Sequence, residues 1–254
     1  IATVISQFFS AVWVLRFLTG KQAELTLHFR SFHPDLPCIY EIVVLGISSF
    51  VMSFTNGLVQ IACNTMLQTF GGDLYISVMT VINSIREIAQ TPVLAIADGS
   101  SPMISYNYGA KNADRVKKTF RLLLITCLSY SVLLWAAVQL VPRVFVSIFT
   151  ADTSLIEFTA PMLKIYLGGL FLFGIQIACQ MTFTSLGKAV NSIIVAVVRK
   201  FVLLIPLIYI MPHMISDSTT GVYMAEPIAD ITAVIFTSVL FTFQFKKALA
   251  EIQN

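Results

Sequence analysis

Charged side chains inside long apolar segments are the residues of this sequence that could do chemistry. Arg199 and Asp230 lie in two different segments of this kind. A helix rises about 1.5 Å per residue, which places Arg199 about 15 Å from one end of its segment and Asp230 about 12 Å from the opposite end. In a hydrocarbon core about 30 Å thick these depths nearly coincide. An unpaired charge there costs at least about 2.5 kcal/mol, so we predict an Arg199–Asp230 ion pair.

Glu226 lies one helical turn from Asp230 and joins this predicted intramembrane charge network. The pair has two interpretations, which the sequence leaves open. It could be purely structural, or it could be a switch in which protonation of the carboxylate releases the arginine.

Glu87 is a further acid at membrane depth, about 20 Å from the end of its segment. Its neighbour Arg86 points about 100° away on a helix, so adjacency alone does not make the two a pair. A carboxylate at this depth could carry a proton or hold a cation, and we therefore assign Glu87 to ion coupling. Lys200 could approach it from another segment.

Amide side chains recur in the apolar segments at helical spacing. Each set shares one face of its helix, because its members are three or four residues apart. The sets are Asn56, Gln60 and Asn64; Asn83 and Gln90, with Glu87 between them; and Gln176 and Gln180, with Thr184 following. Such amides could simply hold helices together, at about 0.6 to 2 kcal/mol per hydrogen bond. Three parallel sets instead favour a shared cavity that recognises amphipathic or cationic organic compounds.

The segments that must position these residues are membrane spans. Of the 254 residues 57% are hydrophobic and 11% charged, with a mean hydropathy of +0.83. A soluble domain has about 25% charged residues, so lipid must surround much of this chain. We predict an all-α polytopic membrane protein with seven transmembrane helices, because about 20 residues cross the core. The predicted spans are 1–19, 42–66, 74–97, 122–141, 165–187, 189–211 and 222–245.

Lysine and arginine in the connectors indicate the orientation. When the connectors are assigned to alternate sides, eleven of these residues fall on one side and two, Arg143 and Lys164, on the other. The positive-inside rule then predicts a multi-pass protein of the cell (inner) membrane with a cytoplasmic C-terminus.

The polar connector 20–41 divides the chain into one span and six. The predicted organisation is 1–19, then the cytoplasmic connector 20–41, then a six-helix unit with a cytoplasmic tail over 42–254. The sequence begins at Ile1 within an apolar segment, and we expect it to be part of a longer chain.

Three stretches carry a family resemblance. They are Pro102-Met103-Ile104-Ser105-Tyr106-Asn107-Tyr108-Gly109-Ala110-Lys111-Asn112; Ser185-Leu186-Gly187-Lys188 with Arg199-Lys200 downstream; and Ala225-Glu226-Pro227-Ile228-Ala229-Asp230. Together they resemble the C-terminal half of multidrug and toxic compound extrusion (MATE) transporters, most closely the MepA-like branch.

The resemblance implies twelve helices in two six-helix lobes. Span 1–19 would be the last helix of the N-terminal lobe, which is otherwise missing here, and 42–254 would be the C-terminal lobe. Some branches have a cation-binding acid midway along the seventh helix. The matching region holds Asn56, so the resemblance does not carry a sodium site over to this chain. Pro102 and Gly99 are expected to interrupt their helix, and Gly109 to permit the turn that follows.

The function predicted from these observations is secondary-active multidrug efflux by alternating access, as an antiporter driven by a proton or sodium gradient. The partners would be small organic cations or drugs, membrane lipid and the N-terminal lobe; no nucleic acid, metal or cofactor is expected. A seven-helix receptor and a lipid-linked precursor flippase are alternatives. No nucleophile or metal motif suggests an enzyme.

Overall fold

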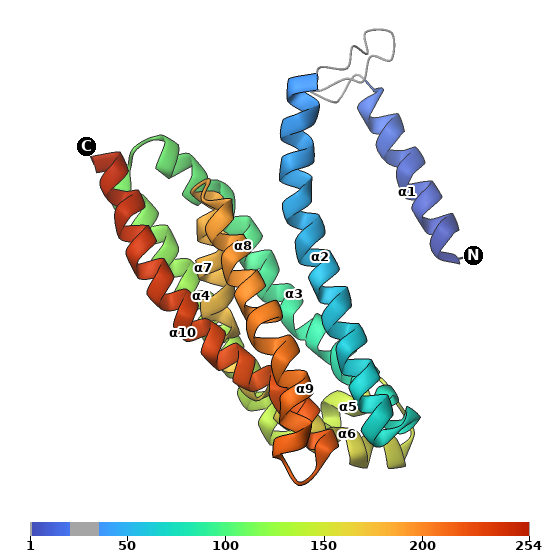
Figure 1. The fold of residues 1–254 in the computed structure, drawn as a ribbon. Helices are drawn as coiled ribbons and strands as arrows, with labels where there is room; N and C mark the ends of the chain where they lie inside the picture. Colours follow the sequence, from blue (N-terminus) through green and yellow to red (C-terminus); the bar gives the residue numbers. More distant parts are fainter. Residues whose placement is uncertain (1, 21–35, 254) are drawn as a thin grey trace. The chain divides into compact units, whose positions relative to one another are not determined.

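The computed structural model describes residues 2–20 and 36–253, and the elements in these ranges are helices (Figure 1). They form two compact units, Ile1–Ile47 and Ser48–Asn254. The first contains α1, Ala2–Leu18, and the beginning of α2, Leu36–Gly71. Most of the predicted connector 20–41 lies outside the described residues. The proposed division into lobes therefore stays a prediction.

Helix α3, Asp73–Gly109, is longer than its predicted span, because Pro92 and Pro102 lie inside it without ending it. The expectation that Pro102 and Gly99 interrupt the helix was therefore wrong. Helices of membrane proteins tolerate proline, since neighbouring groups satisfy the freed carbonyl. The left-handed residue of the following turn is Lys111, with φ of 56°, rather than Gly109.

Helices α4, Ala113–Leu140, and α5, Pro142–Ser147, follow this turn. Asn112 caps α4 by accepting a hydrogen bond from the backbone N–H of Arg115 at 3.1 Å. Both α3 and α4 pack against α7. The close approach of α4 and α7 depends on Gly174, because a Cβ there would lie 2.5 Å from the backbone of Cys127.

One apolar run crosses the unit as three consecutive helical pieces. They are α6, Thr153–Tyr166; the 3₁₀ segment η2, Leu167–Leu172; and α7, Phe173–Ser185. The run starts earlier than the predicted span 165–187. Its 3₁₀ segment includes Gly168 and Gly169, and it packs closely on α10, Ser218–Gln253, at Pro227 and Asp230.

The next run is α8, Ala189–Val197, followed by the π-helical segment η3, Val198–Leu204, and α9, Ile205–Met214. Short π segments inside α-helices are frequent at functional sites. This one contains both Arg199 and Lys200, and it packs against α10.

Four helical runs in the described ranges are long and apolar enough to cross a membrane. They are Ala113–Leu140, Thr153–Ser185, Val190–Met214 and Ser218–Ile252, and Val4–Leu18 is a shorter apolar helix. These four agree with the last four predicted spans. The count of seven remains a prediction.

Candidate functional site

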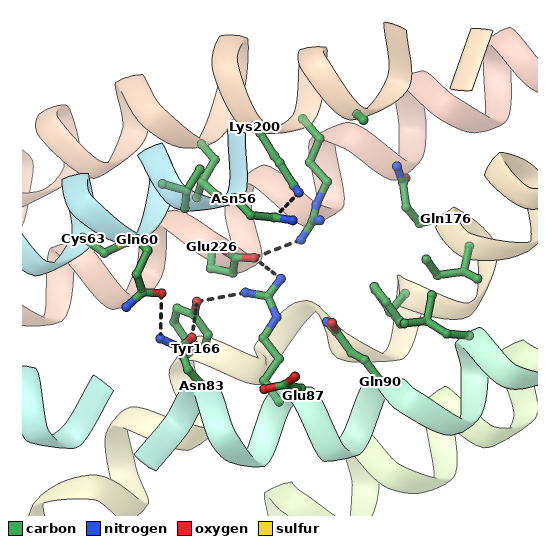
Figure 2. Close-up of a pocket in the computed structure, with 18 of the residues that line it drawn as sticks. Asn56, Gln60, Cys63, Asn83, Glu87, Gln90, Tyr166, Gln176, Lys200 and Glu226 are labelled. Carbon is green, nitrogen blue, oxygen red and sulfur yellow. Dashed lines mark hydrogen bonds and ion pairs between the residues drawn. The ribbon is translucent and has the colours of Figure 1, made fainter. Parts of the chain in front are cut away.

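A cavity of about 480 Å³ opens between α2, α3, the α6–α7 run, the α8–η3 run and α10. Figure 2 shows polar side chains from these elements pointing toward one another. All three predicted amide sets contribute to its lining, through Asn56, Gln60, Asn83, Gln90, Gln176 and Gln180. The shared cavity predicted from the spacing of the amides is therefore present. Its size falls in the range of small-molecule sites, roughly 300–1,000 Å³.

Two arginines and two acids form a charge network in the cavity wall. Arg199 Nε donates to Asp230 Oδ1 at 2.7 Å, so the predicted ion pair is confirmed. Arg199 Nη2 also contacts Glu226 Oε1 at 2.9 Å. Arg86 Nη2 approaches the same Glu226 oxygen at 2.5 Å. Glu226 therefore bridges two cations, and within the described ranges its other oxygen, Oε2, is buried without a hydrogen-bond partner.

Helix geometry explains how three elements meet at this point. Glu226 and Asp230 are four residues apart on α10 and so share a face. Arg199 reaches both from η3, and Arg86 reaches Glu226 from α3. Burial of these charges is tolerated because each is paired.

Tyr166 extends the network into a chain of hydrogen bonds. Arg86 Nη1 donates to the Tyr166 hydroxyl at 2.9 Å, and this hydroxyl donates to Asn83 Oδ1 at 3.4 Å. Asn83 Nδ2 then donates to Gln60 Oε1 at 3.1 Å, and Gln60 Nε2 donates to Asn64 Oδ1 at 3.2 Å. The guanidinium of Arg86 also lies over the Tyr166 ring, 5.5 Å from its centroid. The amides of α2 are thereby linked to the charges of α3 and α10.

Lys200 does not pair with Glu87, as the sequence had suggested it could. Its Nζ donates instead to Asn56 Oδ1 of α2. Glu87 lines the cavity, but it is exposed, and its carboxylate forms no ion pair or hydrogen bond with the residues that the structure describes. Whether Glu87 takes part in ion coupling stays a prediction.

The remaining predicted residues differ in burial and in whether they line the cavity. Gln176 is buried and accepts a hydrogen bond from Thr237 Oγ1 at 3.0 Å, which ties α7 to α10. Gln180 Nε2 donates to the carbonyl of Ser192 at 3.4 Å. Asn64 and Asp230 lie just outside the cavity lining, each bonded to a residue that belongs to it. The roles of these amides in recognition and of Asp230 in ion coupling remain predictions.

Arg86 and Tyr166 are the network members that sequence reasoning did not assign to the site. Arg86 was considered only as the neighbour of Glu87, and spacing along α3 does not say which of two adjacent residues faces α10. Tyr166 falls at the start of its predicted span, where a tyrosine is ordinarily an interfacial residue. No group of three or more His, Cys, Asp or Glu in residues 2–20 and 36–253 could hold a metal ion.

Comparison with known proteins decides the family. The MatE family model matches residues 48–210, which include the amide sets and both arginines. The chain belongs to the MatE family. This MatE chain is 23% identical over 230 residues to the multidrug export protein MepA of Staphylococcus aureus (strain NCTC 8325 / PS 47), covering 91% of the chain and 50% of MepA. It therefore spans about half the length of the curated relatives it matches.

Solved structures agree on the fold. A crystal structure of MATE in complex with MaL6 matches with a TM-score of 0.85 and 18% identity, over 97% of this chain and 56% of that one. An outward-facing multidrug resistance MATE transporter of the MOP superfamily matches with a TM-score of 0.84 and 18% identity, over 97% and 55%. The chain thus has the MATE fold, and its membership of the MatE family does not favour the seven-helix receptor.

Proposed function

We propose that this MatE chain forms the C-terminal lobe of a secondary-active antiporter that exports amphipathic or cationic organic compounds. The single observation that carries the proposal is the cavity in which three sets of amides surround a buried charge network. Amides and aromatic side chains suit loose recognition, because they can donate to, accept from or stack on many different compounds.

Similar proteins and the residues of the cavity both support this proposal. The name of the Staphylococcus aureus relative describes a multidrug exporter, and one of the similar crystal structures is a complex with MaL6. In this chain, Glu87 is an exposed acid on the cavity wall and is suited to the cationic group of a compound. A second lobe would complete the path, and the compound would be reached alternately from the two sides of the membrane.

Coupling would use the bridging carboxylate. Glu226 holds Arg86 and Arg199 together through one oxygen, and its second oxygen has no partner among the described residues. Protonation of Glu226 would weaken both ion pairs and let α3, η3 and α10 move apart. The driving ion would then be a proton. A sodium gradient is the alternative, with Na⁺ held by the same carboxylates.

The test is transport of ethidium into everted membrane vesicles that contain the gene product bearing this chain, because export from the cell corresponds to uptake by such vesicles. Proton and sodium gradients are imposed separately, and the matched control is the variant Glu226→Gln. We expect a proton gradient to drive uptake of the dye into wild-type vesicles and the variant to lose this response. No uptake under either gradient would contradict the proposed function.

A further inference from the structure

Lys200 differs from the other cations of the cavity in its surroundings. Arg86 and Arg199 are both neutralised by carboxylates, through Glu226 and Asp230. The Nζ of Lys200 instead donates to a neutral amide oxygen, that of Asn56, and within the described ranges it has no carboxylate within ion-pair distance. An ammonium group has three N–H donors. Asn56 accepts from one of them, which leaves two without a partner among the described residues.

The position of Lys200 along its helical run keeps its ammonium group away from the membrane surface. It lies ten residues from the start of the run Val190–Met214 and fourteen from its end, which is about 15 and 21 Å along the helix axis. Lysines that extend their ammonium to the membrane surface lie near helix ends. Lys200 is too central for this, and a charged group at such depth calls for an anionic partner.

The side chains around Lys200 allow a bound compound to supply that anionic partner. Lys200 and Asn56 both line the cavity, and so does Glu87, which is carried by α3 on the other side of the view in Figure 2. The carboxylate of Glu87 also has no ion pair with any residue that the structure describes. The network between them is balanced, with two arginines and two acids. Among the described residues, one cation and one anion without an ion pair, Lys200 and Glu87, therefore line a cavity whose other charges balance.

We propose that Lys200 is the binding point for an anionic group, such as a carboxylate, of the compound in the cavity. The cavity then selects dipolar compounds whose acidic group lies on Lys200 and whose cationic part lies toward Glu87. This inference rests on the proposed function, because it names the chemistry of the compound that the same cavity binds. It adds to a site for organic cations one contact that only compounds with an anionic group can use.

Two dyes that differ in one charged group test this directly. Rhodamine 110 has a free carboxylate, and rhodamine 123 is its methyl ester, so both have the same cationic ring system. Binding of each dye to the gene product bearing this chain, in phosphatidylcholine nanodiscs, is measured by fluorescence anisotropy. These discs contain no anionic lipid that could compete. The variants are Lys200→Met, Lys200→Arg and, as a control, Lys118→Met, which removes an exposed lysine outside the cavity.

We expect Lys200→Met to raise the Kd of rhodamine 110 by about tenfold or more, because removing one partner of a desolvated charge pair has effects of this size. The Kd of rhodamine 123 should stay the same or fall. Lys200→Arg should keep the preference for the carboxylate, and Lys118→Met should change neither Kd. An equal change for both dyes in Lys200→Met, or no change, would overturn the inference alone. Failure of the wild-type chain to bind either dye would contradict the proposed function as well.

Discussion

Arg86 of α3 and Glu226 of α10 form an ion pair with 2.5 Å between Nη2 and Oε1, and Glu226 is almost fully buried. The pair fixes α3 to α10 at the cavity wall. Because the same oxygen of Glu226 also contacts Arg199, one carboxylate holds three elements together.

The first prediction concerns this carboxylate. Glu226→Gln should lower the free energy of unfolding by about 3 kcal/mol, since it leaves two buried arginines with a single acid, Asp230. Heat stability in detergent, followed by fluorescence-detected gel filtration, measures the effect. The control is Glu157→Gln, which breaks the exposed Arg143–Glu157 pair of 2.9 Å and should change stability by less than about 1 kcal/mol. Equal losses in the two variants would show that the network does not stabilise the fold.

The second prediction tests the hydrogen-bond chain. Tyr166→Phe keeps the ring under Arg86 but removes the hydroxyl that links Arg86 to Asn83. We expect a loss of about 1–2 kcal/mol, because two partly buried polar groups, those of Arg86 and Asn83, lose a partner. Tyr209→Phe, at an exposed tyrosine, is the matched control in the same heat-stability measurement. A loss no larger than that of the control would mean that the chain adds nothing to stability.

The third prediction compares two adjacent glycines of η2. A Cβ on Gly169 would lie 2.9 Å from Asp230 Cβ and 3.3 Å from Pro227 Cα, whereas one on Gly168 would lie at an ordinary 3.5 Å from Pro227 Cβ. Gly169→Ala should therefore destabilise the protein by about 1–3 kcal/mol through overpacking, and Gly168→Ala should not. Thermal unfolding of both variants checks this. The reverse order would contradict the packing of η2 on α10.

The fourth prediction is a pH dependence outside the membrane spans. Hydroxyl groups of Thr220 and Thr219 and the backbone N–H of Thr219 donate to Asp217 and hold the pKa of its carboxyl below its ordinary value. A lowered pKa contributes stability above the unfolded value of about 3.9, and this contribution is lost as the pH falls through the folded value. Wild-type stability should thus fall below about pH 4.

The matched variant for this pH dependence is Asp217→Asn. Asn caps a helix about as well as Asp but carries no charge. The stability difference between wild type and variant should shrink between pH 6 and pH 3 when unfolding midpoints are compared. A difference that is constant over this range would rule out the role of the ionised carboxylate.

The sequence predicted the features that depend on one helix or on depth in the membrane. The Arg199–Asp230 pair followed from helical rise alone, and the shared cavity followed from the spacing of the amides. Features that depend on how helices rotate against each other could not be predicted. The spacing placed Glu87 on the cavity face and its neighbour Arg86 about 100° away, and only packing on α10 directs Arg86 to Glu226. The π segment that presents Arg199 to α10 and Lys200 to Asn56 has no sequence signature.

The points at which the helices begin and end also depend on packing between helices. Pro102 lies inside α3 although proline usually ends a helix, and helices of membrane proteins tolerate proline because neighbouring groups can satisfy the freed carbonyl. The contacts that a helix makes with its neighbours cannot be read from the spacing of residues along that helix. The run from Thr153 to Ser185 likewise begins before its predicted span. Its 3₁₀ segment lies where Gly169 packs closely on α10.

The central claim is that the cavity between α2, α3, α7, η3 and α10 binds the transported compound, and filling it tests this claim most directly. Gln90 lines the cavity, and its side chain forms no hydrogen bond with the described residues, so Gln90→Trp fills the space without breaking a bond. Ile125→Trp adds the same bulk at an exposed position of α4. Ethidium uptake into everted vesicles should be lost in Gln90→Trp, with its heat stability kept, and should be unchanged in Ile125→Trp. Uptake by a folded Gln90→Trp variant at the wild-type rate would contradict the account.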